Sequence, residues 1–342
     1  MKYYLKRFIP IYKASNVLCI GFARKEGQYI ETIYNEDNIA LLKTLLEFGI
    51  AKHCLDVPLY SLLKKYNFLE TIFRGKNTEI NRGELFLSYL EIEDPLVITD
   101  RRVLIFGAGA GGSTLVYMLA QSGIKNILIV DFDLVSESDV FRISVFEKSD
   151  VGQYKVDVLK KRIHKNFNIS ITAIVDGFTE YTKLSNLIDA FIPDIVIKAC
   201  DPSSIFRVNL NKICFERHIP FMMMAYSFES LKIGPLYVPC FTSCDESFNT
   251  LQKKTYGEHY DFKDDKRLFS DLLVHPSISF NINMLASFVF KEVVLFLLGK
   301  YEYCFSIGRL IEFNPLSLNY YTFEANCDEN CVVCNQLKKL TT

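Results

Sequence analysis

The residues best suited to chemistry lie between Arg101 and Lys155. Glycines let a backbone approach phosphate groups closely, and the free N–H groups of a following helix can bind them. Asp131 ends the next apolar run, about 20 residues later, where a carboxylate can accept hydrogen bonds from ribose hydroxyls. This βαβ pattern predicts a nucleotide site on an α/β fold. Its glycines stand in G-x-G-x-x-G spacing after a short apolar run, at Gly107, Gly109 and Gly112.

Charged residues beyond Asp131 narrow the choice of nucleotide chemistry. Asp133 follows two residues later, and Arg142 and Lys155 occur in the runs DVFR and GQYK. Two cations placed after a ribose-binding acid have no obvious role in hydride transfer, which disfavours a nicotinamide dehydrogenase. They suit an enzyme that stabilises charge on a triphosphate while a carboxylate attacks its α-phosphorus.

Together these motifs resemble the E1-like adenylating family, the ThiF, MoeB and ubiquitin-activating group. Its pattern is G-x-G-G-x-G, D-x-D, N-x-x-R-Q, G-x-x-K and a later Asp after an apolar strand, matched here in DIVIKACDPSS. The resemblance implies a Rossmann-like domain with a mostly parallel sheet, and ATP and Mg²⁺ as cofactors. It implies catalytic roles for Arg142, Lys155 and Asp201, with Asp201 holding Mg²⁺, and nucleotide contacts from Gly107, Gly109, Gly112, Asp131, Asp133 and Asp139.

The chain departs from the family pattern at three places. Asp139 stands where the family has Asn, and Ile143 where it has Gln. A carboxylate near a triphosphate would cost on the order of 4 kcal/mol at 4 Å with an effective dielectric of 20. Asp139 is therefore expected to face away, pair with a cation or bind the metal. The family also often places an upstream arginine at the partner subunit's ATP; Arg82 is the nearest candidate, although Glu84 lies closer to the expected position.

The cysteines match the family's structural zinc site only in part. That site uses two C-x-x-C pairs, which supply four thiolates in tetrahedral geometry. Cys331 and Cys334 form the second pair, but Ser247 stands where Cys244 should have its partner. Either Cys240 or Cys327 could supply a fourth thiolate. Zinc binding and ordinary free or buried thiols both remain open, and a catalytic thioester cysteine is not expected.

The first 80 residues predict a separate module of strands and two short helices, similar to a winged helix. Its lysines are scattered among acidic residues, which disfavours nucleic-acid binding. A surface that binds peptide by strand addition is the preferred interpretation, and a plain packing or dimerisation domain is the alternative. The polar run Gly75–Glu84 predicts the linker, and residues 81–342 the adenylation domain.

This long N-terminal module narrows the resemblance to the subgroup that matures ribosomally made antibiotic peptides, such as pantocin A and microcin C. In that subgroup the N-terminal domain clamps the precursor peptide. The resemblance implies ATP-dependent adenylation of carboxyl groups on such a precursor, with cyclisation and dehydration of its glutamate side chains. The alternatives are a microcin-type phosphorus–nitrogen bond, adenylation of a ubiquitin-like sulfur carrier, or a catalytically silent scaffold.

Composition sets the remaining expectations. The chain has 342 residues, a net charge of -1 and ten cysteines, and it shows no secretory signal. These features indicate a cytoplasmic protein with reduced thiols. The apolar run Ile278–Leu298 contains Lys291 and Glu292 and predicts a core or dimer-interface helix, not a membrane span. A homodimer is the family expectation. Residues from about 245 to 272 are polar and weakly patterned, and predict a crossover loop or a surface insertion.

Overall fold

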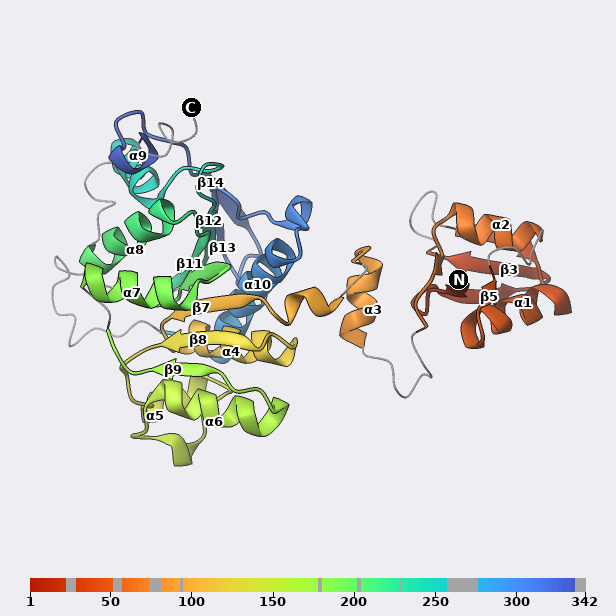
Figure 1. Cartoon of the computed structure of the whole chain (residues 1–342), viewed down its shortest axis with the longest axis horizontal. Helices are drawn as coiled ribbons and strands as arrows, with labels where there is room; N and C mark the ends of the chain where they lie inside the picture. Colours follow the sequence, from red (N-terminus) through yellow and green to blue (C-terminus); the bar gives the residue numbers. More distant parts are fainter. Residues whose placement is uncertain are drawn as a thin grey trace. The chain divides into compact units, whose positions relative to one another are not determined.

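The computed structural model describes residues 1–22, 29–51, 57–73, 82–92, 95–177, 180–201, 204–227, 229–256 and 276–335. The chain divides into two compact units, Met1–Pro95 and Leu96–Thr342. Figure 1 shows both units, each built around its own sheet or sheets.

The second unit is organised around an eight-stranded sheet of order β14-β13-β12-β11-β10-β7-β8-β9. The five strands from β11 to β9 run parallel, and β12, β13 and β14 continue the sheet in antiparallel pairs. The predicted Rossmann-like, mostly parallel architecture is thus confirmed. The strands are β7 Arg102–Phe106, β8 Asn126–Val130, β9 Thr172–Ile174, β10 Ile195–Lys198, β11 Phe221–Ser227, β12 Ser230–Tyr237, β13 Arg309–Phe313 and β14 Tyr320–Glu324.

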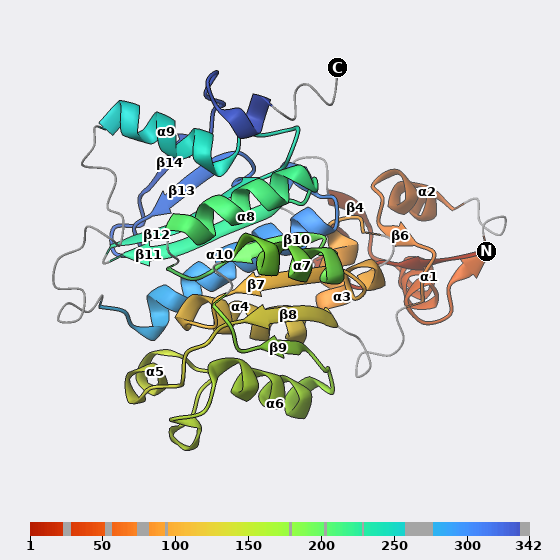
Figure 2. The ribbon, with the colours of Figure 1, turned by 60° about the vertical axis from the view of Figure 1, so that its left-hand side comes forward.

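Helices cover both faces of this sheet, as Figure 2 shows. The central strands therefore consist of continuous apolar runs, because each strand is buried on both faces. On one face pack α4 Ala110–Gln121, α6 Lys155–Phe167 and α10 Ser279–Leu297. On the other face pack α7 Tyr181–Phe191, α8 Ser204–Glu216 and α9 Asp245–Tyr256. Further helices of this unit are α5 Glu137–Arg142 and the short η1 Pro95–Ile98, η2 Lys148–Asp150 and η5 Tyr301–Tyr303.

Helix α10 is long and apolar enough to cross a membrane by length and composition alone. Just over half of its apolar window, 56%, is buried inside the protein, which is typical of a core helix in a soluble domain. Glu292 in this helix is buried and accepts hydrogen bonds from the backbone N–H and hydroxyl of Ser306. α10 therefore packs largely in the core of its unit, in agreement with the prediction of a core or dimer-interface helix.

The first unit contains two three-stranded sheets, of order β5-β1-β6 and β2-β3-β4. The first two strands, β1 and β2, are separated by the segment Lys6–Pro10. Asn35 caps α1, because the Asn35 side chain accepts the Asn38 backbone N–H at 2.8 Å. The elements are β1 Lys2–Leu5, β2 Ile11–Ala14, β3 Val17–Gly21, β4 Tyr29–Ile33, α1 Glu36–Glu47, β5 Ile50–Ala51, α2 Pro58–Lys65, β6 Leu69–Glu70 and α3 Arg82–Tyr89.

The prediction of a crossover loop at residues 245–272 is wrong for the first part of this range, because α9 spans Asp245–Tyr256. Two acids lie in the first turn of α9 and two lysines in its last turn, so the charges complement the helix dipole. Residues 257–272 lie outside the described residues. Residues 75–81 of the expected linker also lie outside the described residues. The last residues of the expected linker, from Arg82 to Glu84, form the start of α3.

Candidate functional site

The glycine turn joins β7 to α4 and is sterically specified at two positions. Gly107 has a φ of +104°, a region that favours glycine. A Cβ atom on Gly112 would lie 1.9 Å from the Gly107 carbonyl oxygen, so only glycine fits there. A Cβ on Gly109 would meet nothing within 4 Å, and Gly109 faces open space at the N-terminus of α4. This open space leaves room for a ligand against the first N–H groups of the helix.

A cavity of about 1000 Å³ opens at the carboxyl ends of the parallel strands. Gly112 and Asp139 do not line it but lie directly behind residues that do. Arg82 belongs to the other unit, where it begins α3 with an exposed side chain. The predicted residues that line the cavity are Gly107, Gly109, Asp131, Asp133, Arg142, Lys155 and Asp201.

Asp131 is held in place by backbone donors on both of its carboxylate oxygens. The Ala108 N–H donates to Oδ2 at 2.5 Å, and the Asp133 N–H donates to Oδ1 at 2.7 Å. The carboxylate is thus fixed between the glycine turn and the loop after β8. Each oxygen retains acceptor capacity toward the cavity, which suits recognition of a ribose hydroxyl.

Asp139 pairs with both predicted cations. Its Oδ1 accepts from Arg142 Nη2 at 2.7 Å, and its Oδ2 lies 3.6 Å from Lys155 Nζ. The side chain is 2% exposed. Ser136 adds a capping box, donating its N–H and hydroxyl to Oδ2 at 3.0 and 2.9 Å. Of the three expectations for Asp139, the structure selects pairing with a cation.

The pKa of Asp139 follows from this environment. Burial alone would raise it, but the hydrogen bonds from Ser136 and the charges of Lys155 and Arg142 lower the pKa below its ordinary value of 3.8. The carboxylate is therefore ionised at neutral pH and offsets part of the positive charge beside the cavity. Lys155 also donates to Asp133 Oδ2 at 3.1 Å.

Sequence reasoning missed two partners of Arg142. Its Nη1 donates to the Tyr226 hydroxyl and to Ser277 Oγ, each at 3.0 Å. Tyr226 lies in β11 and Ser277 just before α10, and both line the cavity. They are 84 and 135 residues from Arg142 in the chain, so no local pattern links them. The spacing of Ser136 and Asp139, by contrast, is a capping-box signal that could have been found.

A buried lysine supports the segment that contains Asp201. Lys198 is 7% exposed, and its Nζ donates to the Cys200 carbonyl oxygen at 3.0 Å. Burial lowers the pKa of Lys198 and raises the pKa of the Cys200 thiol to about 11. The Cys200 thiol is therefore neutral at physiological pH, which does not favour it as a nucleophile.

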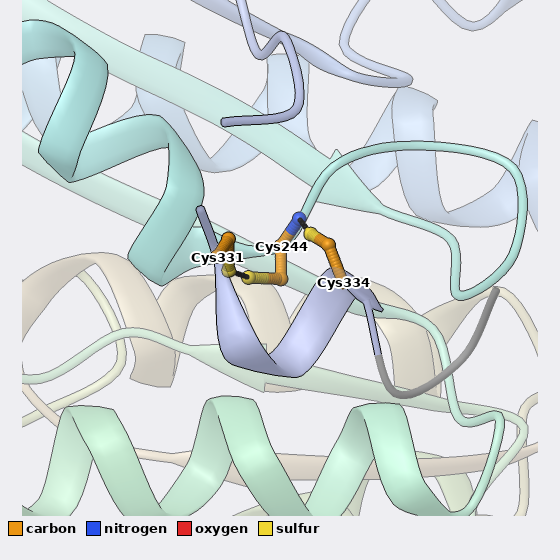
Figure 3. A group of neighbouring side chains, drawn as sticks. All are labelled: Cys244, Cys331 and Cys334. Carbon is orange, nitrogen blue, oxygen red and sulfur yellow. Dashed lines mark hydrogen bonds between the residues drawn. The ribbon is translucent and has the colours of Figure 1, made fainter. Parts of the chain in front are cut away.

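Three of the predicted metal-binding thiols come together in the same unit. Cys244, Cys331 and Cys334 are buried, and their sulfur atoms lie within 4.8 Å of one another (Figure 3). Cys244 Sγ is 3.4 Å from Cys331 Sγ, and the Cys244 N–H points to Cys334 Sγ at 3.4 Å. Burial raises the pKa of the Cys331 thiol, so this thiol is protonated without a cation.

The two candidates for a fourth ligand differ in their surroundings. Cys240 is exposed, and its sulfur lies 3.4 Å from His218 Nδ1, outside the three-thiol group. Cys327 is also exposed, and it interacts with Cys334. Ser247 directs its N–H to Cys244 Sγ at 3.5 Å, while its hydroxyl accepts the Asp328 N–H. The thiols fit a soft metal, and Cys327 is better placed than Cys240 to complete the set.

Comparison with known proteins places the chain in a family. The sequence pattern of the ThiF family matches residues 86–333, which is most of the chain. The chain belongs to the ThiF family. The predicted E1-like membership is therefore confirmed, and the match begins only near the end of the first unit.

Curated relatives within this family match part of the chain. Molybdopterin-synthase adenylyltransferase of Escherichia coli is 30% identical over 138 residues, which is 40% of this chain and 54% of that protein. tRNA threonylcarbamoyladenosine dehydratase of Bacillus subtilis is 34% identical over 143 residues, which is 42% of this chain and 54% of that protein. The chain thus spans about half the length of the curated relatives it matches.

Solved structures extend the fold similarity through the N-terminal unit. E. coli MccB crystallised with ATP has a TM-score of 0.72 at 22% identity, covering 98% of this chain and 100% of that chain. The microcin C7 biosynthetic enzyme MccB with N-formylated MccA has a TM-score of 0.73, also at 22% identity and with the same coverage. PaaA has a TM-score of 0.64 at 19% identity, and the match covers 78% of this chain and 91% of the PaaA chain. These similarities establish a shared fold.

Proposed function

We propose that this protein uses ATP to adenylate a carboxyl group on a ribosomally made precursor peptide. The observation that carries the proposal is the cavity itself, where a glycine turn and a fixed ribose acceptor face two cations. Gly109 and Asp131 form one side of this arrangement, and Arg142, Lys155 and Asp201 complete it. Membership of the ThiF family supports the same chemistry.

The side chains that line the cavity have different roles according to their charge. Asp131 accepts from ribose hydroxyls, and the N-terminus of α4 faces the phosphates. Arg142 and Lys155 stabilise the negative charge that develops as the peptide carboxylate attacks the α-phosphorus. A bond from the carboxylate oxygen to the α-phosphorus forms, the bond from the α-phosphorus to the bridging oxygen breaks, and pyrophosphate leaves with that oxygen. The product is an acyl-adenylate, which is a good electrophile.

The carboxylate oxygens in the cavity fit Mg²⁺, which prefers hard oxygen ligands. Asp201 lines the cavity with an exposed side chain and would hold the ion, directly or through water. A bound Mg²⁺ would neutralise charge on the phosphates. Arg82 reaching the partner subunit's ATP stays a prediction, as does the homodimer, and light scattering of the purified protein would test the dimer.

The N-terminal unit provides edges on which a peptide could add as a strand. In the sheet β2-β3-β4, the outer strands β2 and β4 each have one unpaired edge among the described residues. Tyr12 on β2 and Ile33 on β4 are 59% and 68% exposed. Backbone pairing with an extended peptide would hold the substrate, and pockets beside these side chains would select it. The similarity to MccB, solved with N-formylated MccA, includes this unit.

The fate of the acyl-adenylate distinguishes the candidate reactions. Attack by a nitrogen or carbon of the same peptide, with loss of AMP, would cyclise a glutamate side chain with net loss of water. A microcin-type reaction would instead leave a nucleotide attached through a phosphorus–nitrogen bond. The fold similarity to MccB over 98% of the chain supports the microcin-type reaction as the second candidate. A sulfur-carrier substrate would need no peptide-docking unit.

Mass spectrometry tests the proposal directly. Candidate short peptides encoded beside the gene are incubated with the protein, ATP and Mg²⁺, and a ubiquitin-like carrier protein is assayed in parallel. Loss of water supports cyclisation, and gain of a nucleotide supports the microcin-type route. Lys155→Met is the matched variant, because it removes the charge and keeps an unbranched side chain of similar length. If neither peptides nor carrier exchange radioactive pyrophosphate into ATP, adenylation is rejected.

We also propose that Cys244, Cys331, Cys334 and Cys327 bind a structural zinc ion. The three clustered sulfurs support this set, and so does the interaction of Cys327 with Cys334. Metal analysis of purified protein should give about one zinc per chain. Cys327→Ser should weaken zinc retention against a chelator, and the matched Cys240→Ser should not. Metal-free protein with an unchanged melting temperature would reject a structural zinc.

A further inference from the structure

Cys240 and His218 form a thiol–imidazole pair outside the nucleotide cavity. In the antiparallel pair of β11 and β12, Phe221 lies opposite Tyr237. His218 precedes Phe221 by three residues and Cys240 follows Tyr237 by three, so the same register brings the two side chains together. The Cys240 sulfur lies 3.4 Å from His218 Nδ1, and both residues are exposed. The pair is therefore accessible from solvent.

The pair lies at the opposite edge of the sheet from the nucleotide cavity. Phe221 is the first residue of β11, whereas the residues of β11 that line the cavity are Met224, Ala225 and Tyr226. Neither Cys240 nor His218 lines that cavity. Chemistry at this pair is therefore independent of ATP binding.

A smaller pocket of about 420 Å³ opens beside the pair, and Cys240 forms part of its wall. Ser243 lines the same pocket and is 4% exposed. Its hydroxyl has no hydrogen-bond partner among the described residues. A buried hydroxyl without a partner costs free energy, which a polar ligand in the pocket would recover. His218 does not line the pocket, so the imidazole leaves that space free for such a ligand.

An imidazole beside a thiol makes the cysteine a better nucleophile. His218 Nδ1 can accept the Cys240 proton, and the thiolate is the form of cysteine that attacks disulfides. We propose that Cys240 is a thiolation site, which forms a mixed disulfide with a small polar disulfide held in this pocket. The Ser243 hydroxyl binds a polar group of that disulfide, such as an amide.

The exchange balances without any other oxidant. The Cys240 sulfur attacks one sulfur of the disulfide while His218 Nδ1 takes the thiol proton. A new S–S bond forms as the old S–S bond breaks, and the leaving thiolate takes the proton from His218. One disulfide and the Cys240 thiol are consumed, and one mixed disulfide and one free thiol are formed.

Oxidised glutathione is the probe, because it is a small disulfide with amide and carboxylate groups. Full-length protein is incubated with it at pH 7, and mass spectrometry of proteolytic fragments follows the thiolation of Cys240 over time. A free cysteine is only a few per cent thiolate at this pH, so an imidazole partner can raise the rate by at most about 20- to 30-fold. Because a thiolate that forms more readily is also a weaker nucleophile, we expect Cys240 to react about tenfold faster in folded protein than in protein unfolded in urea.

Two variants separate the roles of the imidazole and the pocket. His218→Gln removes the base and should slow the thiolation of Cys240 by about tenfold. His164→Gln is the matched control, because it removes an exposed histidine from α6 in the same unit and should keep the wild-type rate. Ser243→Ala should slow the reaction with oxidised glutathione by about 2- to 10-fold, as for one hydrogen bond, and leave the reaction with diethyl disulfide unchanged.

The comparison of folded with unfolded wild-type protein needs no variant. If Cys240 reacts no faster in the folded protein, the proposal is overturned. A His218→Gln protein that keeps the wild-type rate would overturn it too. An unchanged rate with oxidised glutathione in Ser243→Ala would reject the pocket as the place where the disulfide binds.

Discussion

Replacing Asp139 by Asn tests the ion pairs behind the cavity. The substitution keeps the shape of the side chain but removes the charge that faces Arg142 and Lys155. Asp139 is 2% exposed, so solvent screens these pairs little. Removing one partner of a buried ion pair costs about 3–5 kcal/mol. Because Asn can still accept hydrogen bonds, we expect the lower value, about 3 kcal/mol at pH 7.

The size of the folded unit converts this value into a measurable shift. For a unit of roughly 150–250 residues, each kcal/mol moves the melting temperature by about 2–4 °C, which gives a loss of about 6–12 °C. The Arg142 guanidinium would also face a neutral amide oxygen in place of the carboxylate 2.7 Å away, so kcat for adenylation should fall. Asp133→Asn is the matched control. Its carboxylate also pairs with Lys155, but its side chain is 52% exposed, and such pairs contribute about 0–1 kcal/mol.

The pH dependence provides a second check. The folded-state pKa of Asp139 lies below the ordinary 3.8, so its contribution to stability is present above that pH. The contribution is lost as the pH falls through the folded-state pKa. Urea denaturation at pH 7, 5 and 3 should show a constant gap between wild type and Asp139→Asn at the two higher values, and a smaller gap at pH 3. A gap below about 0.5 kcal/mol at pH 7, or one independent of pH, would refute the reasoning.

Three further predictions concern the glycine turn, the cations and the thiols. Gly112→Ala should lower the melting temperature, because its Cβ would lie 1.9 Å from the Gly107 carbonyl oxygen. Gly109→Ala should change it by less than about 2 °C yet raise the Kd for ATP, and equal melting temperatures in the two variants would contradict this. Lys155→Ala should reduce kcat/KM for pyrophosphate release by about 100-fold or more, and unchanged turnover would exclude its catalytic role. Burial raises the pKa of Cys331, so zinc binding must displace protons. Zinc affinity in chelator competition should therefore rise between about pH 6 and 8, and a flat profile would count against thiolate ligation.

The sequence predicted well what depends on local pattern. The apolar runs before Gly107 and Asp131 became β7 and β8, and the helix expected after the glycines became α4. Glycine spacing, strand hydrophobicity and helix periodicity act over a few residues, so they can be recognised without the fold. The same local signals placed Asp131 at the carboxyl edge of the sheet.

The environment of each site residue could not be predicted in this way. Whether Asp139 faced the triphosphate or a cation depended on how α5 and α6 pack together. The partners of Arg142 come from distant strands and loops. The missed helix α9 is different, because its charged ends were visible in the sequence.

The contacts of Arg142 have a consequence for protein synthesis. The guanidinium bridges α5, β11 and the start of α10, so the last of its partners, Ser277, is translated 135 residues after it. A nascent chain that has emerged from the ribosome only as far as α5 contains Arg142. It does not yet contain the partners that orient the Arg142 side chain. Activity should therefore appear late in translation, and prematurely terminated products that lack Ser277 should be unable to consume ATP in the cell.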